Sequence, residues 1–160
     1  MGFYAITGLI NAVTSTALGA FIWLRNPQHP VNQKYALFNL AVAVWSYSYF
    51  FWQISNDSLA ALFWARILMG GAILIPGPFL DFVLTWVGRH KQHKSYLIFC
   101  YILSAFFVIL DFTPFIVSGV EARYIIPYWP VPGVAFHFAL FLFFVNAFYA
   151  CYVLSDVFSH

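Results

Sequence analysis

The chain has 160 residues, of which 63% are hydrophobic, 22% aromatic and only 8% charged, with a formal net charge of +2. Its mean hydropathy is +0.83. A soluble domain of this size cannot bury so much apolar surface, so the composition excludes a water-soluble fold and indicates a chain solvated mainly by a bilayer. The small positive charge comes from short loops and gives no reason to expect a nucleic-acid partner.

Five apolar runs are long enough to cross about 30 Å of hydrocarbon at a rise of 1.5 Å per residue. They lack the period-two alternation of barrel strands. We therefore expect an all-α, polytopic transmembrane helix bundle that forms a single domain over residues 1–160. The predicted helices are residues 3–24, 35–54, 59–87, 96–117 and 133–158.

Basic residues are distributed unevenly among the connections. Arg25 and Lys34 flank the first loop, and residues 88–95 form the one strongly basic stretch. These loops lie on the side that also receives the C-terminus, whereas Arg123 is the one basic residue expected in the loops of the opposite side. The positive-inside rule then predicts an N-terminus outside and a C-terminus in the cytoplasm, in a bacterial inner membrane.

The connections carry turn and cap residues. Pro27 and Pro30 are expected to end the first helix, Asn32 to cap the second, and residues 55–58 to cap the third. The fourth connection, residues 113–132, is rich in proline and in aromatic side chains. This composition is typical of an interfacial aromatic belt, and it also suits a lid over a cavity between helices.

Ionisable groups at membrane depth are costly, so each needs a partner or a purpose. Arg66 and Asp111 lie at similar depths, roughly 10 Å and 9 Å from the outer ends of their helices. We expect them to pair, either as a structural contact or with Arg66 receiving an anionic ligand group. Asp81 lies in the inner half of the third helix, where a hydrogen bond with Asn39 is expected and a protonation switch is the alternative.

Several polar and aromatic residues share the outer half of the bundle with that pair. A few polar groups inside an aromatic shell suit a small amphiphile or a lipid. The predicted ligand-binding set is Arg66, Asp111, Gln53, Trp52, Trp64, His137 and Asn11.

His137 is the one histidine inside a predicted span. A single histidine is compatible with an axial ligand to chlorophyll magnesium or to a five-coordinate haem, and equally with a hydrogen-bonded helix contact. We predict no metal cluster, and bound lipid is the expected non-protein component.

Two helices have unusual compositions. The third contains Gly70-Gly71 and Pro76-Gly-Pro78, which predict a close helix approach followed by a kink. The fifth is rich in phenylalanine at several angles around its axis, which indicates contacts with lipid, pigment, other membrane subunits or a second copy. These residues are Phe136, Phe138, Phe141, Phe143, Phe144 and Phe148.

Several short motifs follow one another in the first ninety residues. They are Asn26-Pro-Gln-His-Pro-Val-Asn32, Phe38-Asn39, Trp45-Ser-Tyr47, Phe63-Trp-Ala-Arg66 and the segment from Pro76 to Phe82. In this order and spacing they resemble the N-terminal seven-helix membrane region of bacterial sensor histidine kinases. The similarity covers residues 1–90 well, while residues 95–160 agree in hydropathy and in the aromatic outer loop.

The resemblance implies a non-enzymatic input domain that passes a stimulus to cytoplasmic kinase or PAS modules, and it implies no particular ligand. The departures are that five helices are predicted instead of seven, and that Asp81 stands where a histidine or another polar residue is expected in relatives. We therefore predict a membrane sensory domain that binds a small amphiphile or lipid in its outer half. The alternative is an accessory structural subunit of a respiratory or photosynthetic complex that binds lipid or pigment.

Overall fold

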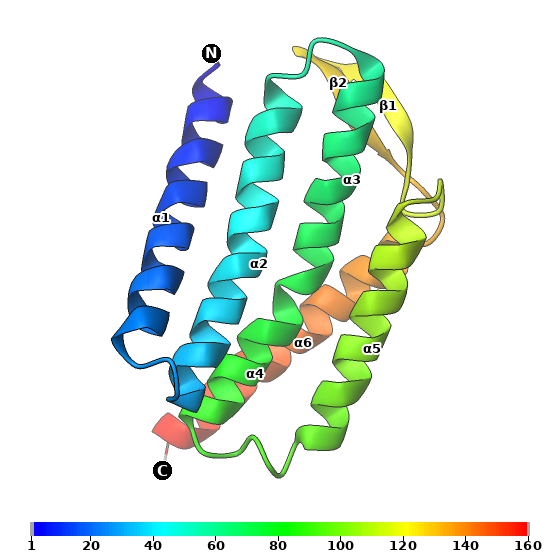
Figure 1. Cartoon of the computed structure of the whole chain (residues 1–160). Helices are drawn as coiled ribbons and strands as arrows, with labels where there is room; N and C mark the ends of the chain where they lie inside the picture. The colour runs from blue at the N-terminus through cyan, green and yellow to red at the C-terminus, as the bar shows by residue number, and fades with distance from the viewer. Residues whose placement is uncertain (1, 160) are drawn as a thin grey trace.

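The computed structural model describes residues 2–159, and in that range it consists of six helices and one β-hairpin (Figure 1). α3 and α4 together form one interrupted span, Ser58–Trp86, so the five predicted helical passes are present. The all-α membrane bundle expected from the sequence is confirmed. The elements are α1 (Phe3–Arg25), α2 (Pro30–Gln53), α3 (Ser58–Leu74), α4 (Pro76–Trp86), α5 (Lys94–Asp111), β1 (Val117–Arg123), β2 (Ile126–Pro132) and α6 (Phe136–Phe158).

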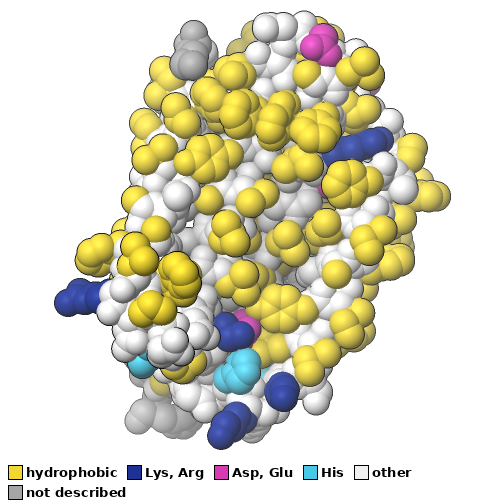
Figure 2. Space-filling model, viewed as in Figure 1, with side chains coloured by type: hydrophobic (Ala, Val, Ile, Leu, Met, Phe, Trp, Pro, Cys, Tyr) yellow, Lys and Arg dark blue, Asp and Glu magenta, His cyan; other side chains and the backbone are white. Residues whose placement is uncertain are grey.

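The lengths and compositions of the helices identify a multi-pass membrane protein. α1, the α3–α4 span, α5 and α6 are each long and apolar enough to cross a bilayer. α2 is more polar but has 24 residues and packs between α1 and α3. Hydrophobic side chains cover much of the face in Figure 2, and Lys and Arg side chains gather at its lower end. We call that end, with the α1–α2 and α4–α5 loops, the basic end, and the opposite one the hairpin end.

The α3–α4 span is the centre of the bundle. In its most apolar window 61% of the residues are buried, against 28% in α1, α5 and α6. The predicted kink is present, because the helix is interrupted at Ile75 and restarts at Pro76, whose ring removes one backbone donor. The bend visible in Figure 1 directs α4 toward α6, while α3 stays against α2 and the hairpin.

The start of α2 differs from the sequence expectation, whereas the cap of α3 agrees with it. α2 begins at Pro30 and not at residue 35, since proline fits the first turn of a helix. Asn32 therefore does not cap α2. Its Nδ2 donates to the carbonyl oxygens of Ile22 and Asn26, at 3.1 and 3.2 Å, and so satisfies the end of α1. Asp57 caps α3 by accepting a hydrogen bond from Ala60 N at 2.9 Å, as the polar stretch 55–58 predicted.

The fourth predicted helix is too long, because α5 ends at Asp111 and the chain continues into the β1–β2 hairpin. The hairpin lies across the hairpin end of α2 and α3 (Figure 1). Trp52 Nε1 donates to the carbonyl oxygen of Tyr128 at 2.7 Å, and the Tyr128 hydroxyl donates to Asn56 O at 3.1 Å. The prolines of β2 are tolerated because this two-stranded sheet leaves the outer edge of each strand unpaired.

Gly71 brings α2 and α3 into backbone contact, as the Gly70-Gly71 pair predicted. A Cβ atom at position 71 would lie 2.9 Å from both the N and the Cα atoms of Trp45. Neither backbone atom can move away as a side-chain tip can, so the glycine sets the distance between the two helices.

We expect Gly71→Ala to lower the free energy of unfolding by about 1–3 kcal/mol, the usual cost of overpacking, because the new methyl group forces α2 and α3 apart. Thermal unfolding in detergent measures this. The matched control is Gly77→Ala, where the new Cβ would lie 3.8 Å from a Tyr101 ring atom, an ordinary contact. Equal stability of the two variants would contradict this account of Gly71.

Candidate functional site

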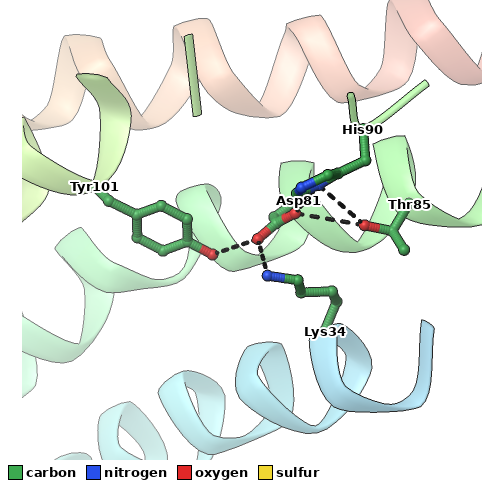
Figure 3. Close-up of polar contacts among 5 residues, drawn as sticks. All are labelled: Lys34, Asp81, Thr85, His90 and Tyr101. Carbon is green, nitrogen blue, oxygen red and sulfur yellow. Dashed lines mark hydrogen bonds and ion pairs between the residues drawn. The ribbon is translucent and has the colours of Figure 1, made fainter. Parts of the chain in front are cut away.

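The most highly connected polar group of the bundle is the carboxylate of Asp81, which is 1% exposed. One oxygen, Oδ2, accepts from Lys34 Nζ at 2.8 Å and from the Tyr101 hydroxyl at 2.9 Å. The other, Oδ1, lies 2.8 Å from His90 Nδ1 and accepts from Thr85 Oγ1 at 3.4 Å. Figure 3 shows these four side chains converging on Asp81 from different directions. We call these five residues the Asp81 cluster.

The Asp81 cluster joins four segments near the basic end. Asp81 and Thr85 lie one turn apart on α4, Lys34 lies in the second turn of α2, Tyr101 lies on α5, and His90 belongs to the α4–α5 loop. Gly88, at φ +75°, ends α4 with a left-handed turn in which Arg89 N donates to Leu84 O at 2.8 Å. This turn reverses the chain, so that His90 reaches back to Asp81.

An ionised carboxylate has room for about four hydrogen-bond donors, and Asp81 uses both oxygens twice. A buried carboxylate with an ammonium partner and several hydrogen bonds is the arrangement in which a charge is tolerated inside a membrane protein. The expected hydrogen bond with Asn39 is not formed, since Asn39 Nδ2 donates instead to the carbonyl oxygen of Tyr35 on its own helix at 2.9 Å.

A second ion pair fastens α6 to the same end of the bundle. Arg89 Nη1 lies 2.7 Å from Asp156 Oδ2, and both side chains are partly exposed. The neighbouring His93 shares a hydrogen bond of 3.0 Å with the Tyr149 hydroxyl. The basic α4–α5 loop therefore contacts α6 through Arg89 and His93, and the Asp81 cluster through His90.

The predicted ion pair between Arg66 and Asp111 is not formed within 4.0 Å. Arg66 donates instead to the carbonyl oxygens of Phe112 and Val117, at 3.1 and 3.4 Å. The physical reason is that α5 ends at Asp111, which exposes carbonyl groups that a guanidinium can satisfy. Asp111 is buried, its Oδ2 lies beside Gly70, and its Oδ1 has no hydrogen-bond partner among the described residues.

Of the other predicted ligand residues, two line cavities and three make separate contacts elsewhere. Trp52 and Gln53 line cavities beneath the hairpin. Trp64 stacks on Phe51 with ring centroids 4.5 Å apart. Asn11 donates to Ser46 Oγ at 2.6 Å, and His137 is exposed on α6 beside the ring of Phe136. The set therefore does not converge on one site, because depth alone does not determine which face of a helix carries a residue.

Three cavities follow one another under the hairpin. The outermost, of about 350 Å³, is lined by Gln53 and the hairpin turn, and it shares Trp52 and Arg123 with the next. That second cavity, also of about 350 Å³, shares Trp45 and Phe136 with a third, of about 340 Å³, between α2, α3 and α6. We call this series of cavities the hairpin groove. Because the hairpin forms one wall, the connection 113–132 matches the lid interpretation of its sequence.

Sequence reasoning placed Asp81 in the half of its span nearest the basic loops, as the structure does, but missed all four of its partners. Lys34 and His90 were assigned to loops as topology signals, and Tyr101 was not distinguished from other aromatic residues. One signal was present in the sequence: Asp81 and Thr85 are four residues apart on one helix face, and such spacing is typical of a polar cluster.

We expect Lys34→Met to lower the free energy of unfolding by about 2 kcal/mol, the scale of a charge-assisted hydrogen bond, because it leaves a buried carboxylate without its ammonium partner. Adding Asp81→Asn should restore part of that loss, so that the double change costs less than the sum of the single ones. Thermal unfolding in detergent measures all three.

Lys91→Met, at an exposed position of the same end, is the matched control and should be close to neutral. Strictly additive effects of Lys34→Met and Asp81→Asn would show that the two side chains are not energetically coupled.

Comparison with known families agrees with the sequence resemblance. Residues 8–159 match the family described as the N-terminal 7TM region of histidine kinase. No curated protein and no solved structure matches the chain significantly. The match extends beyond residues 1–90 to include α5, the hairpin and α6. The chain thus belongs to the family of N-terminal seven-helix membrane regions of histidine kinases, which are sensory input domains.

Proposed function

We propose that this membrane input domain senses a small amphiphile that enters the hairpin groove. The observation that carries the proposal is the adjacency of three cavities, which share lining aromatic side chains from α2, α6 and the hairpin. Each cavity has a volume within the range of small-molecule sites, and mostly apolar walls with a few polar groups suit such ligands. Family membership favours this sensory role, without catalysis, over that of an accessory subunit.

The architecture offers a route from the groove to the opposite end. Met69 and Ile73 line the groove on α3, and Asp81 lies further along the same interrupted span on α4. An occupant that wedges between α2, α3 and α6 changes how α3 rests on α2. Since Lys34 ties α2 to Asp81, a shift of α3 relative to α2 strains or relaxes the Asp81 cluster. In a kinase, the basic end would face the cytoplasmic signalling modules.

The binding prediction uses three radiolabelled probes of equal chain length: stearate, stearyl alcohol and stearylamine. At least one of them should bind the detergent-solubilised protein at one molecule per chain. Ala72→Phe, which places a ring inside the groove, should weaken that binding at least tenfold. Ala17→Phe, on the exposed face of α1, should leave it unchanged. Equal effects of both substitutions, or saturable binding by none of the probes, would refute the groove as a ligand site.

The orientation is a separate prediction from the positive-inside rule, with the hairpin end outside and the basic end in the cytoplasm of a bacterial inner membrane. In a Cys151→Ser background, an impermeant maleimide should label Ala122→Cys in intact cells and should not label Gln92→Cys until the membrane is opened. Both positions are exposed. The opposite labelling pattern would reverse the assignment.

A further inference from the structure

We infer that the hairpin groove takes a single-chain amphiphile with an anionic head, of the class of long-chain carboxylates, and that Arg123 receives the head group. This inference rests on the proposed function and assigns the ligand class. It is carried by the charge at the mouth of the groove, by the length of the groove and by the small volume of its deepest cavity.

Arg123 is the one charged residue among the described residues that line the three cavities. It is the last residue of β1, faces both outer cavities, and has no ion-pair partner among residues 2–159. The uncharged polar residues that line the mouth with it are Gln53, Tyr4, Tyr49 and Tyr124. A guanidinium above an otherwise apolar cavity favours a carboxylate, which it can bind through two parallel hydrogen bonds.

The residues that line the groove extend along α2 and the α3–α4 span from the hairpin end toward the middle of the bundle. Gln53, the last residue of α2, lies about 12 Å along the helix from Trp45. Gly71 packs at the level of Trp45, and Ile75 lines the groove about 6 Å deeper on the same span. The sum, about 18 Å, is close to half of the roughly 30 Å hydrocarbon core, which is the depth that one acyl chain occupies within one leaflet.

The deepest cavity, between Met69, Ala72 and Ile73 on α3 and Ala139 and Phe143 on α6, is almost entirely apolar. Its volume of about 340 Å³ lies near the lower limit for small-molecule sites, so it accommodates one acyl chain and not the two chains of a phospholipid. Leu140, at its edge, is 39% exposed, which gives a chain lateral access from the surrounding lipid.

Tyr124, the residue after Arg123, has a φ of 54° and is 98% exposed. A left-handed conformation is unusual for a residue other than glycine. It turns the chain immediately after Arg123, and β2 then returns Trp129 to the wall of the same cavities. The tight turn thus places the guanidinium and the indole at one mouth.

The test measures competition of unlabelled stearate, stearyl alcohol, stearylamine and a two-chain phosphatidylglycerol against the probe that binds. The wild-type chain should prefer stearate over stearyl alcohol by about tenfold. Arg123→Gln should remove that preference and leave the affinity for stearyl alcohol unchanged, and Arg123→Lys should keep most of it. Lys91→Gln, which removes one exposed positive charge from the basic end, should keep it entirely.

The outcomes separate this inference from the proposed function. Equal affinities for stearate and stearyl alcohol, a preference for stearylamine, or tighter binding of phosphatidylglycerol would overturn the carboxylate assignment while leaving the groove as a binding site. A preference for stearate that survives Arg123→Gln would overturn the role of Arg123. If no probe binds, both the inference and the proposed function fail.

Discussion

The structure depends on the burial of one carboxylate, that of Asp81, between the helices at the basic end. Asp81 is stabilised by an ammonium group, a phenol, an imidazole and a hydroxyl, and these come from α2, α5, the α4–α5 loop and α4 itself. Because an unpaired charge at that depth is expensive, the partners must meet in the folded chain. The position of α2 and the path of the basic loop are consequently linked to a single side chain.

At the opposite end, the hairpin is held by hydrogen bonds to helix ends and not by a buried ion pair. Its strands have no further sheet to join, so they are held by contacts to helix termini. Trp52 fixes Tyr128, and Tyr128 in turn fixes the α2–α3 loop. Arg66 satisfies carbonyl groups where α5 gives way to β1. These contacts hold the hairpin against the bundle. The two outer cavities of the hairpin groove lie between the hairpin and the helices.

The central span runs from the hairpin groove to the Asp81 cluster and is interrupted between them. Pro76 separates α3, which lines the groove, from α4, which carries Asp81. Both halves pack against α2, but α3 also contacts the hairpin, whereas α4 bends toward α6.

Local sequence determined the features that depend on composition and on single residues: the five helical passes, the Asp57 cap, the kink at Pro76 and the close approach at Gly71. It did not determine which side chains meet. Residues 113–132 were expected only as a proline-rich connection, and the hairpin found there is held by tertiary contacts such as the hydrogen bond from Trp52 Nε1 to the carbonyl oxygen of Tyr128. Depth along a helix placed Asp81 well, but its partners depend on how each helix is rotated, and that rotation is set by packing between helices and not by any one of them alone.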